Sequence, residues 1–177
     1  MLMRLHKIRL GNQGFTLVEL MIVVGILAVL GAVALPMITS TMPKYRLRSA
    51  ARELVIDFKK AKVEAVKRNR TVVIEFIGVD TQNGSYRLFV NDNEATDGTS
   101  PRSFDPGDVL LATKSLPVGI VFTSHATAPF SGNQSGYNAR GLPFGSSNRK
   151  IIISTNDTPP SRFYTLTLMA AGRVQLE

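Results

Sequence analysis

Glu19 is the residue whose position most needs a chemical explanation, because it is the single charged residue in the apolar run from Phe15 to Leu35. A run of this length can cross a bilayer, since about 20 apolar residues suffice for a spanning helix. A carboxylate inside such a segment is unfavourable by on the order of a few kcal/mol even on lenient insertion scales. The sequence therefore indicates that Glu19 has a function and a partner that offsets its charge.

The residues next to Glu19 form a recognisable motif. Positions 14 to 19 read Gly-Phe-Thr-Leu-Val-Glu, and a short polar segment with several basic residues precedes them. This pattern resembles the type IV prepilin signature, in which a prepilin peptidase cuts after the glycine and the new N-terminal Phe is methylated. The resemblance implies a leader over 1–14, cleavage between Gly14 and Phe15, N-methylation of Phe15, and a role for Glu19 in subunit assembly.

Two other interpretations of the N-terminus stay open. A secretory signal peptide also has a basic start and an apolar core, and Ala32-Val33-Ala34 supplies an A-x-A cleavage site. However, the apolar run exceeds the usual 7–15 residues of such a core. It also contains Glu19, and Pro36 crowds the proposed cut. A plain signal anchor explains the span but leaves Glu19 unexplained.

Other residue types that carry chemistry are sparse. The chain has no cysteine and two histidines, so only His125 remains after the predicted leader. Ser124 precedes His125, but a catalytic triad needs three groups that converge in space. Oxygen ligands at 92–97 offer a calcium alternative, although their spacing matches no EF-hand. The sequence therefore predicts no catalytic residue, no metal site and no cofactor. The oxygen ligands concerned are Asp92, Asn93, Glu94 and Asp97.

A second helical pattern follows the apolar run. Apolar residues recur at alternating steps of four and three from Leu47 to Ala65, which predicts one buried helical stripe. Pro36 and Pro43 lie between the two parts, and because proline removes a helix hydrogen bond, we expect a bend or local melting near Leu35 to Lys44. The residues of the stripe are Leu47, Ala51, Leu54, Phe58, Ala61 and Ala65.

After Arg70 the sequence changes to strand patterns rich in β-branched and aromatic residues. Asn83-Gly84 is a hairpin turn signal, and 130–148 is rich in Gly, Ser and Asn without a predicted strand. We expect an α+β fold in which the long N-terminal helix packs on a mostly antiparallel sheet, or on two small sheets. The predicted strands are 71–77, 86–90, 109–112, 119–123, 150–154, 163–169 and 173–176.

Two short motifs in the β-rich part narrow the resemblance. Tyr137 to Pro143 contains an Ala-Arg-Gly turn, and Ala171 to Val174 reads Ala-Gly-Arg-Val. These motifs resemble the GspH/FimT pilin-like family, which includes the minor pseudopilin of type II secretion and FimT-type minor pilins. The resemblance implies a pilin-like fold with a membrane-spanning helix over 15–43 and a periplasmic domain over 44–177, comprising a helix over 44–70 and a β-rich part over 71–177.

The same resemblance implies a structural rather than enzymatic role. The expected partners are other pilins or pseudopilins, a prepilin peptidase and an inner-membrane assembly platform, with the protein anchored in the inner membrane and its domain in the periplasm. The formal charge of +8 leaves nucleic acid as an alternative partner. Some FimT-type pilins bind DNA, and Arg140 and Arg173 would be the contacts here. The tail Gln175-Leu176-Glu177 lacks a second basic residue, which weakens that alternative.

Overall fold

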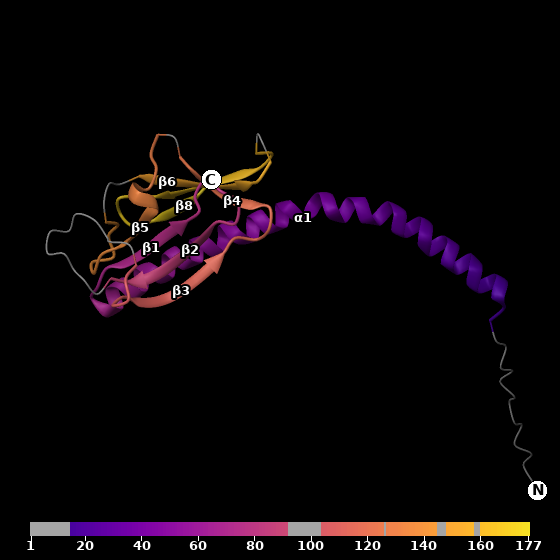
Figure 1. Cartoon of the computed structure of the whole chain (residues 1–177), viewed down its shortest axis with the longest axis horizontal. Helices are drawn as coiled ribbons and strands as arrows, with labels where there is room; N and C mark the ends of the chain where they lie inside the picture. Colours follow the sequence, from indigo (N-terminus) through magenta and orange to yellow (C-terminus); the bar gives the residue numbers. More distant parts are fainter. Residues whose placement is uncertain (1–14, 92–103, 126, 145–147, 158–159) are drawn as a thin grey trace, which may run out of the picture. The chain divides into compact units, whose positions relative to one another are not determined.

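The computed structural model describes residues 15–91, 104–125, 127–144, 148–157 and 160–177, without the side chains of 35–40 and 131 (Figure 1). The chain divides into two compact units, Met1–Ser40 and Thr41–Glu177. The predicted leader 1–14, with Gly14, lies outside the described residues, as do residues 92–103. The predicted domain limits 15–43 and 44–177 place the boundary three residues later than this division.

Helix α1 (Leu17–Arg68) contributes residues to both units. Glu19 lies in its first turn and Lys67 and Arg68 in its last, which suits the helix dipole at both ends. The helix includes Pro36 and Pro43, so the predicted melting near Leu35 to Lys44 is wrong. Each proline removes one main-chain donor, and the remaining hydrogen bonds of a 52-residue helix keep it continuous. The predicted bend stays a prediction.

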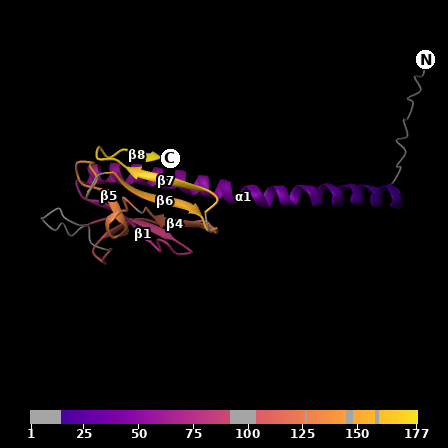
Figure 2. The ribbon, with the colours of Figure 1, turned by 90° about the horizontal axis from the view of Figure 1, so that it is seen from above.

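The predicted stripe on the C-terminal part of α1 is confirmed as its buried face. All six of its residues are almost fully buried, and Ala50 joins them. This face combines alanines with larger side chains, of which Leu54 and Phe58 have no exposed surface. In Figures 1 and 2 the strands lie beside this part of α1.

The β-rich part forms two four-stranded sheets with strand orders β3-β2-β1-β5 and β4-β6-β7-β8. Every pair of neighbouring strands is antiparallel. The first sheet contains β1 (Val72–Ile77), β2 (Ser85–Val90), β3 (Val109–Ser115) and β5 (Gln134–Tyr137). The second contains β4 (Ile120–Ser124), β6 (Arg149–Thr155), β7 (Phe163–Leu168) and β8 (Val174–Leu176). This confirms the predicted α+β class.

An aromatic cluster joins the helix to both sheets. Phe58 of α1 lies 6.4 Å from Phe76 of β1 and 6.2 Å from Phe130, measured between ring centroids. Phe76 in turn meets Phe122 of β4 edge to face at 5.1 Å, an arrangement that aromatic rings favour. Tyr137 of β5 contacts Phe58 edge to face at 6.4 Å. The helix and the two sheets therefore share one core.

Strand β5 is the element that the sequence pattern misses. Its residues Gln134 to Tyr137 are polar or small at three of four positions, and the 3₁₀ turn η1 (Ser131–Asn133) precedes it. It pairs with β1 from Val72↔Tyr137 to Glu75↔Gln134. Pairing with the edge of β1 opposite β2 therefore decides the conformation of β5, rather than its own strand propensity.

Candidate functional site

The first turn of α1 places Glu19 through a local hydrogen bond. The hydroxyl Oγ1 of Thr16 accepts a bond from the main-chain N–H of Glu19 at 3.2 Å. Thr16-Leu17-Val18-Glu19 is also the S/T-x-x-E pattern of a capping box, in which the glutamate can return a bond to the capping residue. The spacing that identifies Thr16 as the capping residue is visible in the sequence. Phe15 is 85% exposed and Glu19 is exposed.

The apolar segment that follows has the length and composition of a membrane span. Leu17–Ala34 is an 18-residue helical window in which no residue is buried within the unit. Its large aliphatic side chains, such as Leu20 and Leu27, are all exposed. A soluble helix buries such side chains against a core, so this surface needs either lipid or other protein around it.

The two motifs from the β-rich part come together at one corner of the domain, which we call the motif corner (Lys62, Tyr137, Gly141 and Gly172). The hydroxyl of Tyr137 donates to the carbonyl of Gly172 at 3.3 Å. The Lys62 ammonium of α1 reaches the same carbonyl at 3.4 Å and lies 5.9 Å from the centre of the Tyr137 ring. The helix thereby holds the two turns together, and Lys62 is a contact that sequence spacing does not reveal.

The backbones of the two turns approach each other closely at the motif corner. A Cβ atom built on Gly172 would lie 2.6 Å from the carbonyl oxygen of Gly141, and both glycines have positive φ, 73° and 71° respectively. Arg140 and Arg173 flank these glycines and are exposed. The structure therefore brings the two candidate DNA contacts onto neighbouring turns, with Lys62 on the adjacent helix.

We expect Gly172→Ala to lower the thermal stability of the domain by clearly more than Gly119→Ala. Gly119 is the matched control because its φ of 84° is also positive, while no described residue beyond its two chain neighbours lies within 4 Å of its hypothetical Cβ. The left-handed conformation alone costs roughly 1–2 kcal/mol for a residue with a side chain. Only Gly172→Ala adds the clash with Gly141. Thermal melts by near-ultraviolet circular dichroism measure the difference, and equal melting temperatures would contradict the close contact.

A buried polar network fixes the other side of the helix. Asp57 is almost fully buried, accepts a hydrogen bond from the Tyr86 hydroxyl at 2.6 Å and pairs with Lys114 Nζ at 2.9 Å. Lys114 also pairs with Glu53 at 2.7 Å. These two carboxylates raise the pKa of Lys114, and burial together with Asp57 raises that of Tyr86. A buried carboxylate requires such partners, so the network is structural and links α1 to β2 and β3.

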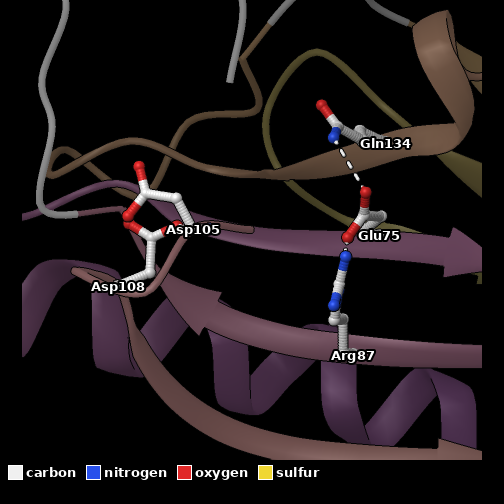
Figure 3. Close-up of polar contacts among 5 residues, drawn as sticks. All are labelled: Glu75, Arg87, Asp105, Asp108 and Gln134. Atoms are coloured by element: carbon white, nitrogen blue, oxygen red, sulfur yellow. Dashed lines mark hydrogen bonds and ion pairs between the residues drawn. The ribbon is translucent and has the colours of Figure 1, made fainter. Parts of the chain in front are cut away.

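Acidic residues on the outer side of the first sheet also have structural partners (Figure 3). Glu75 of β1 forms an ion pair with Arg87 on β2 and accepts a bond from Gln134 at 3.4 Å. Asp105 and Asp108 belong to one turn. The Asp105 carboxylate accepts a hydrogen bond from the main-chain N–H of Gly107 at 2.8 Å, and the Asp108 carboxylate accepts one from the main-chain N–H of Asp105 at 3.0 Å. The calcium alternative at 92–97 lies outside the described residues. Within the described ranges no group of three or more metal-ligating side chains occurs.

His125 lies in a local turn interaction rather than in a catalytic arrangement. Its Nδ1 lies 3.2 Å from the hydroxyl of Thr127 and 3.3 Å from the main-chain nitrogen of that residue. The main-chain N–H of Ser124 donates to Asp80 at 3.0 Å. The structure thus gives His125 a partner, Thr127, in its own turn.

A protein-family model matches most of the domain, including the four residues of the motif corner. A family model described as the type II transport protein GspH matches residues 50–172, which is more than half of the chain. The chain belongs to the GspH family. A second model, of the prokaryotic N-terminal methylation motif, matches residues 9–35 and so includes Gly14, Phe15 and Glu19. The resemblance to the GspH/FimT family is therefore confirmed.

Individual relatives of this GspH-family chain are pilin-like proteins. The chain is 38% identical over 103 residues to the pilin-like protein PilA1 of Thermus thermophilus, a match over 58% of this chain and 59% of that protein. The match thus spans less than two thirds of that relative. The minor pilin FimU of Pseudomonas aeruginosa has the same fold, with 20% identity, a TM-score of 0.53 and coverage of 76% of this chain and 90% of FimU. The minor pseudopilin EpsH of Vibrio cholerae gives a TM-score of 0.46 at 15% identity, over 75% and 96% of the two chains.

Proposed function

We propose that this GspH-family chain is the precursor of a minor pseudopilin or minor pilin, a filament subunit of a type II secretion system or a type IV pilus. The observation that carries the proposal is the combination of two features on one helix. The N-terminal part of α1 is apolar, exposed and bears the methylation motif, and its C-terminal part is the core helix of a GspH domain. The proposed role is structural and requires no catalytic residue.

The exposed part of α1 offers a surface for neighbouring helices. Apart from the helix's own backbone, no described residue lies within 4 Å of a Cβ built on Gly25 or Gly31, so no contact in the described part of the chain explains these glycines. Glycine in a helix interior is unfavourable by about 1 kcal/mol relative to alanine, whereas small residues let helices approach closely in lipid. We infer that the span first contacts lipid in the inner membrane and later contacts the helices of other pilin-like subunits, with the domain on the periplasmic side.

Processing at Gly14 is the first consequence. A prepilin peptidase would cut between Gly14 and Phe15, and the new amine of Phe15 would be methylated before an assembly platform adds the subunit to the filament. Glycine presents no side chain to a protease subsite, so we expect Gly14→Leu to retain the leader while the wild-type chain starts at methylated Phe15. Intact-mass measurement of membrane-extracted protein from cells with the peptidase distinguishes the two forms.

The control for processing is Gln13→Leu, which changes the neighbouring leader residue and leaves the Gly-Phe junction intact. This variant should still yield the chain that starts at Phe15. A mature N-terminus at Leu35 would support the secretory signal peptide instead. An uncut wild-type chain would support the plain signal anchor, and either result would overturn the proposed processing.

DNA binding is a second candidate function, and the motif corner is the observation that favours it. Arg140 and Arg173 are exposed on contacting turns, next to Lys62. Three cations at one corner could contact neighbouring phosphates. An electrophoretic shift with the purified chain tests this: loss of a shift in the Arg140→Ala, Arg173→Ala double variant supports the function, and no shift for the wild-type chain excludes it under those conditions.

A further inference from the structure

Exposed apolar and cationic side chains lie side by side at the end of the domain where α1 enters it. We call this the base surface and define it by residues of the helix and of two loops. Val118 is 83% exposed and Phe163 is 60% exposed, although such side chains are normally covered. Exposed apolar groups of this size beside charged ones mark interaction sites. The base surface consists of Lys44, Tyr45, Arg46, Val118, Arg162 and Phe163.

Strand register brings these residues together. Ile120 at the start of β4 pairs with Thr155 at the end of β6, and Ser154 pairs with Phe163 at the start of β7. The main-chain N–H of Asn156 donates to Gly119 at 3.0 Å, which joins the two loops. In Figure 2 the arrowhead of β6 points toward this end of the domain.

The helix completes the base surface. The Arg46 guanidinium donates to the carbonyl of Val118 at 3.4 Å, so α1 contacts the loop that carries the exposed valine. A hollow of about 330 Å³ opens between Lys44 and Leu47 of the helix and residues 161–164 of the β6–β7 loop. Its wall therefore combines an ammonium, a guanidinium and an aromatic ring.

The charge of this end is positive. Lys44, Arg46 and Arg162 belong to the base surface and Arg48 follows on the same helix; all four are exposed. The acidic group in the adjoining loop is Asp157, whose carboxylate accepts the main-chain N–H of Ser161 at 2.9 Å. Glu177 is also exposed near this end, because its main chain pairs with Thr165, two residues from Phe163. The four cations outnumber the carboxylates of Asp157 and Glu177, and cations next to a spanning helix are attracted to anionic lipid.

The distance along the chain fits the headgroup layer. Apolar residues continue beyond the span to Met37 and Ile38, and six positions separate Ile38 from Lys44. Six helical residues cover about 9 Å. The polar layer on each side of a bilayer is roughly 5–8 Å thick, from the difference between total and hydrocarbon thickness. Along the chain, Lys44 therefore follows the last of these apolar residues by a length comparable to the thickness of one polar layer.

From these observations we propose that the base surface docks on the anionic phospholipid headgroups of the same bilayer that holds the span. Phe163 and Val118 insert among the headgroups, and Lys44, Arg46 and Arg162 contact lipid phosphates. The proposal rests on the proposed function in that α1 must cross a membrane. As a consequence, the domain of the unassembled subunit is bound to the membrane surface, and it dissociates from that surface when the subunit is added to the filament.

Single-cysteine labelling of the full chain tests the docking, because the protein has no cysteine of its own. A fluorophore is attached at Phe163→Cys or Val118→Cys, and the chain is reconstituted in nanodiscs of phosphatidylcholine with or without phosphatidylglycerol. Lipids that carry a nitroxide near the headgroup quench fluorophores at that depth. The matched control is Leu142→Cys, which is also exposed, at 44%, but adjoins Gly141 near Val66 at the other end of the domain helix. A label at Val33→Cys reports insertion of the span.

We expect quenching at 163 and 118 in anionic nanodiscs, and only background at 142. Quenching at 163 should be lost in the Lys44→Glu, Arg162→Glu variant, and also in 1 M salt, where the screening length is about 3 Å. The Lys44→Arg, Arg162→Lys variant should retain it. The label at 33 should remain quenched in every case.

Three results would overturn the docking while the label at 33 is quenched. These are no quenching at 163, equal quenching with and without anionic lipid, or mutual quenching of labels at 163 that grows with protein concentration, which would assign the surface to a second copy. Absence of quenching at 33 would show that the span is not inserted, and would overturn the membrane anchoring in the proposed function as well.

Discussion

Replacing Phe58 by alanine should lower the melting temperature of the fragment 41–177 by roughly 10 °C or more. The fragment contains the buried face of α1 and both sheets, so it should fold on its own. Phe58 is fully buried and touches three aromatic rings, from β1, from β5 and at Phe130. Removal of a buried Phe side chain typically costs about 3–5 kcal/mol through lost burial and the cavity left behind.

Ile56→Ala is the matched control for this substitution. Ile56 lies two residues earlier on the same helix but is 62% exposed, and exposed substitutions usually change stability by within about 0.5 kcal/mol. Thermal melts of both variants and the parent fragment, followed by circular dichroism, give the comparison. If Phe58→Ala melted with Ile56→Ala, the buried face would not be the core that the structure assigns to it.

Most of the fold could be predicted from the sequence because the helix and most strands have periodic patterns of apolar residues or a local preference for their conformation. The step of four and three from Leu47 to Ala65 needs only helical geometry. The strands other than β5 contain β-branched and aromatic residues, so their local preference agrees with their tertiary position. Strand β5 could not be predicted, because its conformation depends on pairing with β1, which is far away in the sequence.

The N-terminal motif could be predicted from the sequence, whereas the contacts inside the domain could not. Gly14, Phe15 and Glu19 all lie between positions 14 and 19, so the motif can be recognised from one short stretch of sequence. Asp57 and Lys114, in contrast, are separated by more than fifty residues and meet only because β3 lies beside the helix. The motif corner combines the two situations. Its two turns can be recognised as motifs in the sequence, but their contact with each other and with Lys62 follows only from the tertiary structure.

Two physical roles compete for Glu19. In the first, Glu19 completes a capping box with Thr16 and stabilises the start of α1 within one chain. In the second, its carboxylate pairs with the amine of Phe15 on a neighbouring subunit, which is created by cleavage. Within one chain the amine of Phe15 is four residues from Glu19, which would be about 6 Å at the helical rise of 1.5 Å per residue. The intersubunit pair would neutralise two charges in an apolar environment and fix the axial offset between neighbouring helices.

Glu19→Gln separates the two roles, because glutamine also serves in a capping box but carries no charge. We expect Glu19→Gln to be cleaved and inserted normally and yet to fail to crosslink to the other pilin-like subunits, with loss of secretion or piliation. Deleting one partner of a buried pair is unfavourable by about 3–5 kcal/mol, since the other charge stays uncompensated. Thr16→Val removes the capping hydroxyl and keeps the charge, so it should assemble. If Thr16→Val failed and Glu19→Gln assembled, the residue would act through the helix cap, and the intersubunit charge pair would be excluded.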